Sequence, residues 1–129
     1  MDMTSLNTQN NYRDSHLKDK AEFFDVTKFK TATFEASEIT KTEGGEYAYS
    51  AKGKLTLKGI TKDVVMNFNY IGLSPQSQTD EKGVEHKYNV CGFEGKTTIK
   101  RKEFGVGTEL GIVDDVTITM TIEASQDVK

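Results

Sequence analysis

Strict alternation of apolar and polar side chains over long stretches is the sequence feature that most constrains the fold of this chain. The clearest case is residues 115–124, where five apolar side chains at even positions alternate with threonines and acidic residues. Successive side chains of a β-strand point to opposite faces of a sheet, so a period of two indicates a strand with one buried face. Similar alternation occurs at residues 32–37, 47–57 and 63–70. The chain is therefore predicted to be all-β, with a sheet that is apolar on one face.

Turn-forming residues separate the alternating segments from one another. Gly44 and Gly45 are predicted to form one hairpin turn and Gly59 another, because glycine readily adopts the positive backbone angles of tight turns. Residues 73–83 are rich in polar side chains and contain Pro75, so they are predicted to form the longest loop. Strands joined in this way favour an up-and-down antiparallel barrel or a sandwich.

Residues 85–100 change phase within one predicted strand. Apolar side chains at even positions, such as Val90, give way to apolar side chains at odd positions, such as Phe93. A bulge or strong bend at Gly92 or Gly95 would bring both sets to the same face, and bends of this kind curve sheets into barrels. We therefore expect this strand to be bent at one of these glycines.

One segment has the spacing of a helix with a single apolar side. Leu17, Ala21 and Phe24 lie at positions i, i+4 and i+7, which places them on one side of a helix. Asn11 or Asp14 is predicted to cap its N-terminus, because a side-chain oxygen there accepts from the first backbone N–H groups. The chain is thus expected to begin with a short helix of two to three turns.

Length and composition exclude several functional classes. The 129 residues are the size of one domain with one core, and the formal net charge of -3 argues against a nucleic-acid surface. No apolar run approaches the roughly 18 residues that a transmembrane helix needs. Cys91 is the single cysteine, and His16 and His86 have no second histidine or cysteine at metal-ligand spacing. Because no residue pattern proposes a nucleophile with its base either, we expect neither a metal site nor an enzyme.

Three motifs occur in an order and spacing that are known together from one family. They are Arg13-Asp14-Ser15-His16-Leu17 with Phe23-Phe24-Asp25 and Phe34, then the sequence GKLTLKGITK at residues 53–62, and finally RKEFG at residues 101–105. From about residue 3 to residue 124 the chain resembles the YceI-like family of bacterial lipocalin-like, polyisoprenoid-binding proteins. The resemblance implies an extended antiparallel barrel of eight strands with a short helix, a long apolar ligand inside it, and no catalytic activity.

The position of the first motif leads to an expectation about completeness. It begins twelve residues from the start of the chain, whereas the family resemblance implies further strands before it. We therefore expect residues 1–129 to form a single YceI-like barrel domain that lacks its N-terminal strands. About six strands are expected here, counting a partial strand at residues 4–8. The resemblance implies a periplasmic location, with the cytoplasm as the alternative, because the chain itself does not indicate a compartment.

The candidate ligand contacts are the side chains predicted to face the barrel interior. For any one of them plain core packing is the simpler interpretation, whereas for the whole set the resemblance favours ligand contact. Small side chains would leave room for a ligand in the interior, and flexible methionine side chains adapt to a ligand of irregular shape. The predicted set is Phe34, Ala36, Tyr47, Tyr49, Leu55, Leu57, Met66, Phe68, Val90, Phe93, Ile118 and Met120.

Arg13, Asp14 and His16 are the candidate contacts for a polar head group. If they lie near a barrel mouth, they are suitable for binding the polar end of an amphiphile. The alternative is structural: Asp14 caps the helix, Arg13 pairs with a nearby carboxylate and His16 lies on the surface. The sequence leaves both interpretations open, with the structural one preferred.

The most specific functional prediction is a binding or carrier protein without chemistry. Its ligand would be a long apolar isoprenoid-type lipid, polyprenyl or quinone-like, bound in a barrel cavity, and no cofactor is required. Each methylene group of the lipid that is buried contributes about 0.8 kcal/mol before ordering costs, so a long lipid needs no polar anchor. The alternative is a self-associating interaction barrel with a filled interior, in which two copies dimerise through exposed strand edges.

Overall fold

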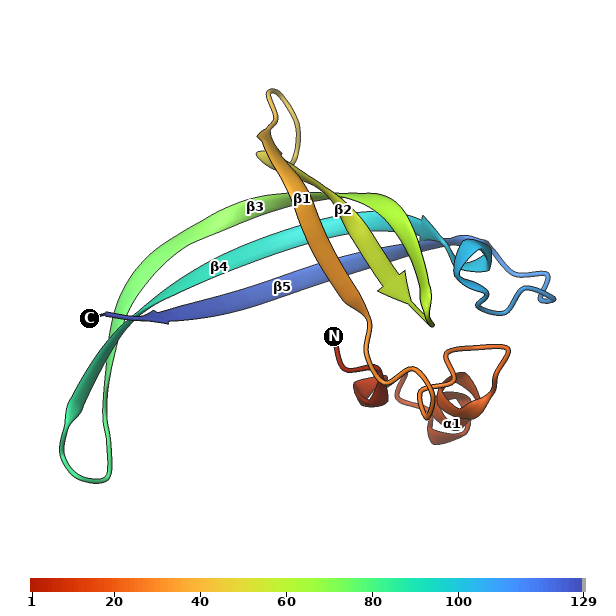
Figure 1. The fold of residues 1–129 in the computed structure, drawn as a ribbon, viewed down its shortest axis with the longest axis horizontal. Coiled ribbons are helices and arrows are strands. Elements are labelled where there is room, and N and C mark those ends of the chain that lie inside the picture. Colours follow the sequence, from red (N-terminus) through yellow and green to blue (C-terminus); the bar gives the residue numbers. More distant parts are fainter. Residues whose placement is uncertain (129) are drawn as a thin grey trace.

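The computed structural model describes residues 1–128 as one five-stranded antiparallel sheet with the strand order β1-β2-β3-β4-β5. Each strand pairs only with its neighbours in sequence, so the topology is an up-and-down meander (Figure 1). The all-β antiparallel fold with one short helix near the N-terminus is thereby confirmed. The strands are β1 (Thr33–Lys41), β2 (Tyr49–Leu57), β3 (Ile60–Thr79), β4 (Glu85–Lys100) and β5 (Asp115–Asp127).

The N-terminal segment contains one strand fewer than predicted. Residues 4–8 do not form a partial strand: the chain makes a 3₁₀ helix at Met3–Ser5, and only Asp2 forms an isolated bridge, to Thr31. The side chain of Asp2 accepts from the backbone N–H of Thr4 at 2.8 Å, which favours the helical turn over an extended backbone. The described residues therefore contain five strands rather than about six.

The helix α1 (Asn11–Asp19) is capped one residue earlier than predicted. The side chain of Asn10 accepts from the backbone N–H of Arg13, whereas the sequence predicts Asn11 or Asp14 in this role. The helix ends at Asp19 with Lys20 as its C-cap, so Ala21 and Phe24 follow it in a turn rather than extend its apolar side. Helical spacing identified the element but placed its C-terminus too late.

The turns predicted at Gly44-Gly45 and at Gly59 are confirmed. Lys58 and Gly59 join β2 to β3 with φ values of 51° and 73°. Positive φ at both central residues is the pattern of the two-residue hairpin turn whose twist matches that of the strands it joins. Gly44 also has a positive φ, of 74°, in the connection between β1 and β2.

The predicted loop at residues 73–83 is wrong, because most of it is strand. β3 continues to Thr79, and the connection to β4 is confined to the short turn around Asp80. Pro75 is paired in register with Asn89. It is tolerated because β2 pairs with β3 only as far as Phe68, so this half of β3 is a sheet edge where a missing N–H is harmless.

The bend predicted at Gly92 or Gly95 is in the wrong strand. The register between β3 and β4 shifts between Tyr70 and Gly72, so the additional residue is Ile71 of β3. The ladder between β4 and β5 runs without a shift along its whole length. The long strands β3, β4 and β5 form a curved arch, which β1 and β2 cross obliquely (Figure 1).

The core lies at one end of this arch, where the N-terminal segment packs against the sheet. Phe104, in the 3₁₀ helix Arg101–Phe104, is the most deeply buried large side chain, with 1% of its surface exposed. The buried apolar cluster consists of Met3, Val26, Ala32, Leu55, Leu57, Ile99, Phe104 and Val106.

Gly53 allows β1 to cross close over β2. A Cβ atom at Gly53 would lie 2.3 Å from the carbonyl oxygen of Glu35 and 2.9 Å from the Cα of Ala36. The ring of Phe34 also lies over this glycine, with its Cζ 2.8 Å from the same point. Because two of these neighbours are backbone atoms, a side chain at position 53 requires the strands to separate.

The substitution Gly53→Ala is expected to lower the free energy of unfolding by about 1–3 kcal/mol, the usual cost of overpacking a tight site. Urea denaturation followed by circular dichroism measures this change. Gly111→Ala is the matched control, because its Cβ would meet nothing within 4 Å. Equal stability of the two variants would contradict the close approach of β1 to β2.

Candidate functional site: an apolar cavity that continues along the inner face

An apolar cavity of about 340 Å³ lies between the N-terminal segment and the end of the sheet that carries the buried core, called the closed end below. Leu55 and Leu57 of β2, Ile99 of β4 and Ile118 of β5 form the sheet side of its wall. All but two of the residues that line it, Arg101 and Gly107, have apolar side chains. The full lining is Met1, Met3, Leu6, Leu17, Phe23, Phe24, Leu55, Leu57, Ile99, Arg101, Val106, Gly107, Ile112, Val116 and Ile118.

Hydrogen bonds hold the N-terminal wall of the cavity in place. The ammonium group of Lys58, in the β2–β3 turn, donates to the carbonyl oxygens of Ala21 and Gly105. The backbone N–H of Gly107 donates to the carbonyl oxygen of Glu22. The segment after α1 is thus bonded both to the sheet and to the loop before β5, which closes the cavity at this end.

Arg101 organises the loop that forms the remaining wall. Its side chain is buried, with 5% of the residue exposed, and its guanidinium donates only to backbone carbonyl oxygens. Five such bonds use the fixed fork of donors that arginine alone provides. The acceptors are Val106 and Val113 at 3.0 Å, Ile112 at 2.8 Å, Leu110 at 3.2 Å, and Gly107.

A row of aromatic side chains continues the apolar surface beyond the cavity. Tyr49 stacks on Phe68 with ring centroids 5.3 Å apart, and Phe68 meets Phe93 edge-on at 6.2 Å. Tyr70 lies 5.5 Å from Phe93 and is 45% exposed. Gly95, between Phe68 and Met120 in the ladders, leaves room beside the rings. The inner face is therefore apolar well beyond the enclosed cavity.

The inner face becomes polar toward the far end of the arch. Along β4 and β5 the inner-face pairs are Phe93 with Ile122, then Cys91 with Ala124, and then Asn89 with Gln126. Side chains two apart on a strand share a face, so these pairs follow one another along the same surface. The surface thus runs from a closed apolar end to an open polar end.

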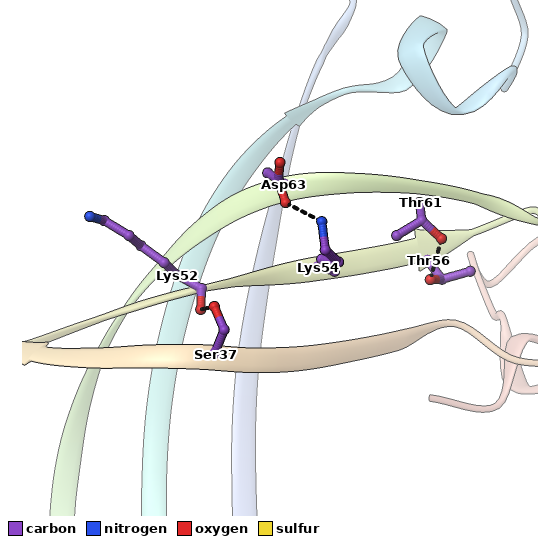
Figure 2. Close-up of polar contacts among 6 residues, drawn as sticks. All are labelled: Ser37, Lys52, Lys54, Thr56, Thr61 and Asp63. Atoms are coloured by element: carbon purple, nitrogen blue, oxygen red, sulfur yellow. Dashed lines mark hydrogen bonds and ion pairs between the residues drawn. The ribbon is translucent and has the colours of Figure 1, made fainter.

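The opposite, outer face of the sheet is polar. Figure 2 shows Lys54 of β2 donating to Asp63 of β3 at 2.8 Å, and the hydroxyls of Thr56 and Thr61 in contact at 2.8 Å. The hydrogen bond from Lys54 holds the pKa of Asp63 below its usual value. Such exposed pairs contribute little stability, so their main effect is to keep this face solvated. Of the two faces, only the inner one is suited to an apolar ligand.

The predicted ligand contacts are distributed over three places. Leu55, Leu57 and Ile118 line the cavity, and their contact with a ligand stays a prediction. Most of the others follow the same face outward along the strands, where ladder register and alternation place them together. This second group comprises Phe34, Ala36, Tyr49, Met66, Phe68, Phe93 and Met120.

Two members of the predicted set lie elsewhere. Val90 is one residue from Cys91 in a ladder without a shift, so it faces away from Phe93, because the bulge lies in β3 instead of β4. Tyr47 precedes β2 and lines a separate, open cavity of about 510 Å³. That cavity lies where β3 and β4 part, since their ladder begins only at Asn67, and its lining carries charges of both signs.

Arg13, Asp14 and His16 lie together on α1 but do not line the cavity. Asp14 accepts from the backbone N–H of Thr8 at 2.8 Å and from its hydroxyl at 2.5 Å. Arg13 donates to the hydroxyl and the carbonyl oxygen of the same threonine. Asp14 does not cap the helix as predicted, because Asn10 does so. Arg13 bonds to Thr8 instead of the predicted carboxylate, and Asp14 bonds to the same threonine. Their role as head-group contacts stays a prediction.

Several residues of the site were not recognised in the sequence. Leu17, Phe23, Phe24 and Arg101 belong to the family motifs, yet alternation could not select them because they lie outside the strands. Within residues 1–128, no helix combines the length and apolar character needed to cross a membrane. The same residues contain no group of three His, Cys, Asp or Glu side chains that could hold a metal ion.

Comparison with known proteins agrees with the motifs and the fold. The family model described as the YceI-like domain matches residues 1–124. The chain belongs to the YceI-like domain family. It is 36% identical over 124 residues to a UPF0312 protein of Ectopseudomonas mendocina and 38% identical over 120 residues to one of Serratia proteamaculans. These matches include 95% and 92% of this chain but 59% and 56% of the relatives, so it spans a little over half of their length.

Solved structures of the family share this arrangement of strands. A YCEI protein of Campylobacter jejuni superimposes with a TM-score of 0.75 at 26% identity, over 98% of this chain and 69% of that one. BcnA of Burkholderia cenocepacia gives 0.70 at 25% identity, over 95% and 70% of the two chains. The YceI-like resemblance and the lipocalin-like antiparallel fold predicted from the sequence are therefore both confirmed.

The substitution Arg101→Lys is expected to lower the free energy of unfolding by about 2–4 kcal/mol, because a lysine leaves several buried carbonyl groups without donors. Urea denaturation measures the loss, and faster amide exchange in residues 105–114 would locate it. Lys102→Gln is the control, since the neighbouring Lys102 is exposed. An Arg101→Lys variant as stable as the control would show that the carbonyl cluster is dispensable.

Acid is expected to loosen the N-terminal segment through Asp14. The hydrogen bond from the Thr8 hydroxyl lowers the pKa of this carboxyl below its unfolded value. The stabilisation is therefore present above the unfolded pKa near 3.8 and is lost as the pH falls through the lower folded pKa.

Thermal unfolding between pH 6 and pH 2.5 tests this dependence. Asp14→Asn should lower stability at neutral pH and reduce the acid-dependent loss relative to the unmodified chain. Asp19→Asn removes an exposed carboxyl from the same helix and serves as the control. Identical pH profiles for Asp14→Asn and the unmodified chain would refute the link to Asp14.

Proposed function

We propose that this chain binds a long apolar lipid of the isoprenoid type, polyprenyl or quinone-like, along the inner face of its sheet. The observation that carries the proposal is a cavity with almost entirely apolar walls that opens onto a continuous apolar surface. Membership of the YceI-like family supports a binding protein of the barrel type. Binding of this kind involves no chemistry and requires no cofactor.

The cavity volume indicates how such a ligand would be placed. At about 340 Å³ it is at the lower end of the roughly 300–1,000 Å³ typical of small-molecule sites. It therefore accommodates the end of a long chain, while the remainder would lie against Tyr49, Phe68 and Phe93. Each methylene removed from water contributes about 0.8 kcal/mol before ordering costs, so both parts of the surface add to affinity.

The polarity of the inner face supports one orientation of the lipid. The closed end lacks polar side chains apart from Arg101, whose donors are already used by carbonyl oxygens. Asn89 and Gln126 lie on the same face at the open end and are exposed to solvent to different degrees. We therefore place the apolar tail in the cavity and the polar head beside these amides. Contacts of the head with Arg13, Asp14 and His16 belong to the reverse orientation.

Lipid extraction and added ligands test the proposal directly. Protein purified from cells should release an isoprenoid lipid into organic solvent, detected by mass spectrometry. Delipidated protein should take up a polyprenyl alcohol or an isoprenoid quinone, detected by native mass spectrometry. Absence of both the extracted lipid and any uptake would remove this function for the chain. Export to the periplasm, which the family resemblance implies, stays a prediction.

Phe93→Ala is expected to weaken the uptake of a polyprenyl alcohol at least tenfold, because it removes the ring at the centre of the aromatic row. Glu94→Ala is the matched control, since this neighbour faces the opposite side of the same strand. Circular dichroism verifies folding, and Phe93→Leu retains an apolar side chain should the alanine variant be unstable. Equal affinity of the Phe93 variants and the control would contradict binding along this face.

A further inference from the structure

Met66 lies between the apolar cavity and the aromatic row on the inner face. It belongs to β3, is 5% exposed, and pairs in register with the buried Ala51 of β2. Neither residue lines the cavity, whose sheet wall includes Ile99 and Ile118. In the other direction, the next residue of β3 on the same face is Phe68, a member of the aromatic row. Met66 therefore separates the two parts of the surface that a lipid would cover.

The side chain of Met66 leans toward the aromatic row and lies over Gly95 of β4. A Cβ atom at Gly95 would lie 3.4 Å from the sulfur of Met66 and 3.3 Å from the Cβ of Phe68. Gly95 pairs with Phe68, which is two residues farther along β3 than Met66. The sulfur thus rests in space that is open because residue 95 is a glycine.

The surface around this methionine offers an apolar path. Met120 of β5 pairs with Gly95 from the other side, so a methionine flanks this glycine on each side. Thr97 is the residue of β4 between Gly95 and Ile99 on the inner face. Its buried hydroxyl donates to the carbonyl oxygen of Val65 at 2.8 Å, so its donor is already used.

We propose that Met66 determines how long a prenyl tail the site accepts. Its unbranched side chain has three rotatable bonds, so it can move off Gly95 and admit a tail that continues from the cavity to the aromatic row. A tail that ends inside the cavity does not reach it. The inference rests on the proposed lipid-binding function and adds to it a selection by tail length.

The strand geometry gives the tail length at which this selection begins. Ile99, at the cavity, and Gly95, beneath Met66, are four residues apart on β4, which corresponds to about 13 Å at roughly 3.3 Å per residue. A prenyl alcohol of two units is shorter than this distance, and one of four units is longer. Geraniol and geranylgeraniol are therefore the two probes that distinguish a tail inside the cavity from one that passes Met66.

Calorimetric titration of the full chain with both alcohols tests the proposal. Met66→Phe places a bulky, less flexible side chain over Gly95, so it should weaken the binding of geranylgeraniol at least tenfold and change that of geraniol less than twofold. Val65→Phe is the matched control, because it places the same ring on the outer face, where Val65 is exposed. It should change the binding of neither alcohol more than twofold. A general loss of structure would weaken the binding of both.

Gly95→Ala is the second variant, because its Cβ displaces the sulfur of Met66 from its resting place. It should also weaken the binding of geranylgeraniol and leave that of geraniol unchanged. Circular dichroism verifies that each variant is folded.

NMR spectra of the methionine methyl groups test the same point without a substitution. Met3 lines the cavity, so its methyl signal should shift when either alcohol is added. The methyl signal of Met66 should shift with geranylgeraniol and stay in place with geraniol. Met3 thus serves as the internal control for occupation of the cavity.

The possible outcomes distinguish this inference from the function on which it rests. If the unmodified chain binds neither alcohol, the lipid-binding function and the selection by length are both refuted. If it binds them, equal weakening of the two alcohols by Met66→Phe, or an equal shift of the Met66 signal with both, overturns the selection by length alone. If Met66→Phe does not fold, Gly95→Ala and the methyl signals of the unmodified chain decide.

Discussion

The buried guanidinium of Arg101 is the interaction on which the closed end of this protein depends. Arg101 directly follows β4. Its guanidinium donates hydrogen bonds to carbonyl oxygens of a loop that has no regular structure to supply other donors. The loop is thereby held against the sheet, where Val106 joins the core and Gly107 bonds to the N-terminal segment. Without this cluster the apolar cavity would lose one of its walls.

The two faces of the curved sheet have different environments. On the outer face, lysine, aspartate and threonine side chains pair with one another and remain solvated (Figure 2). On the inner face, apolar side chains continue from the enclosed cavity to the aromatic row and end at polar amides. The polarity gradient along this surface is suited to the amphiphilic ligand proposed above.

The sequence predictions succeeded where the structure depends on neighbouring residues and failed where it depends on contacts between distant segments. Alternation located the strands, and Gly59 located a turn, because side-chain direction and backbone angle are local properties. Residues 73–83 were assigned to a loop because their composition is polar, yet their place on a sheet edge allows even Pro75 to remain in the strand. Helical spacing likewise could not show that the chain leaves α1 at Lys20 to pack against the sheet.

The sequence alone determined the all-β topology, the apolar and polar faces, and the family to which the chain belongs. The topology and the faces follow from the two-residue alternation of apolar and polar side chains, and the family follows from three motifs in their characteristic order. Only the tertiary structure decided where the interior lies. The one-residue bulge lies at Ile71 of β3, so β4 keeps its alternation unbroken, and Phe93 faces inward whereas Val90 does not. A shift of one residue reverses every side chain beyond it, and the choice of strand for that shift depends on pairing between segments distant in sequence.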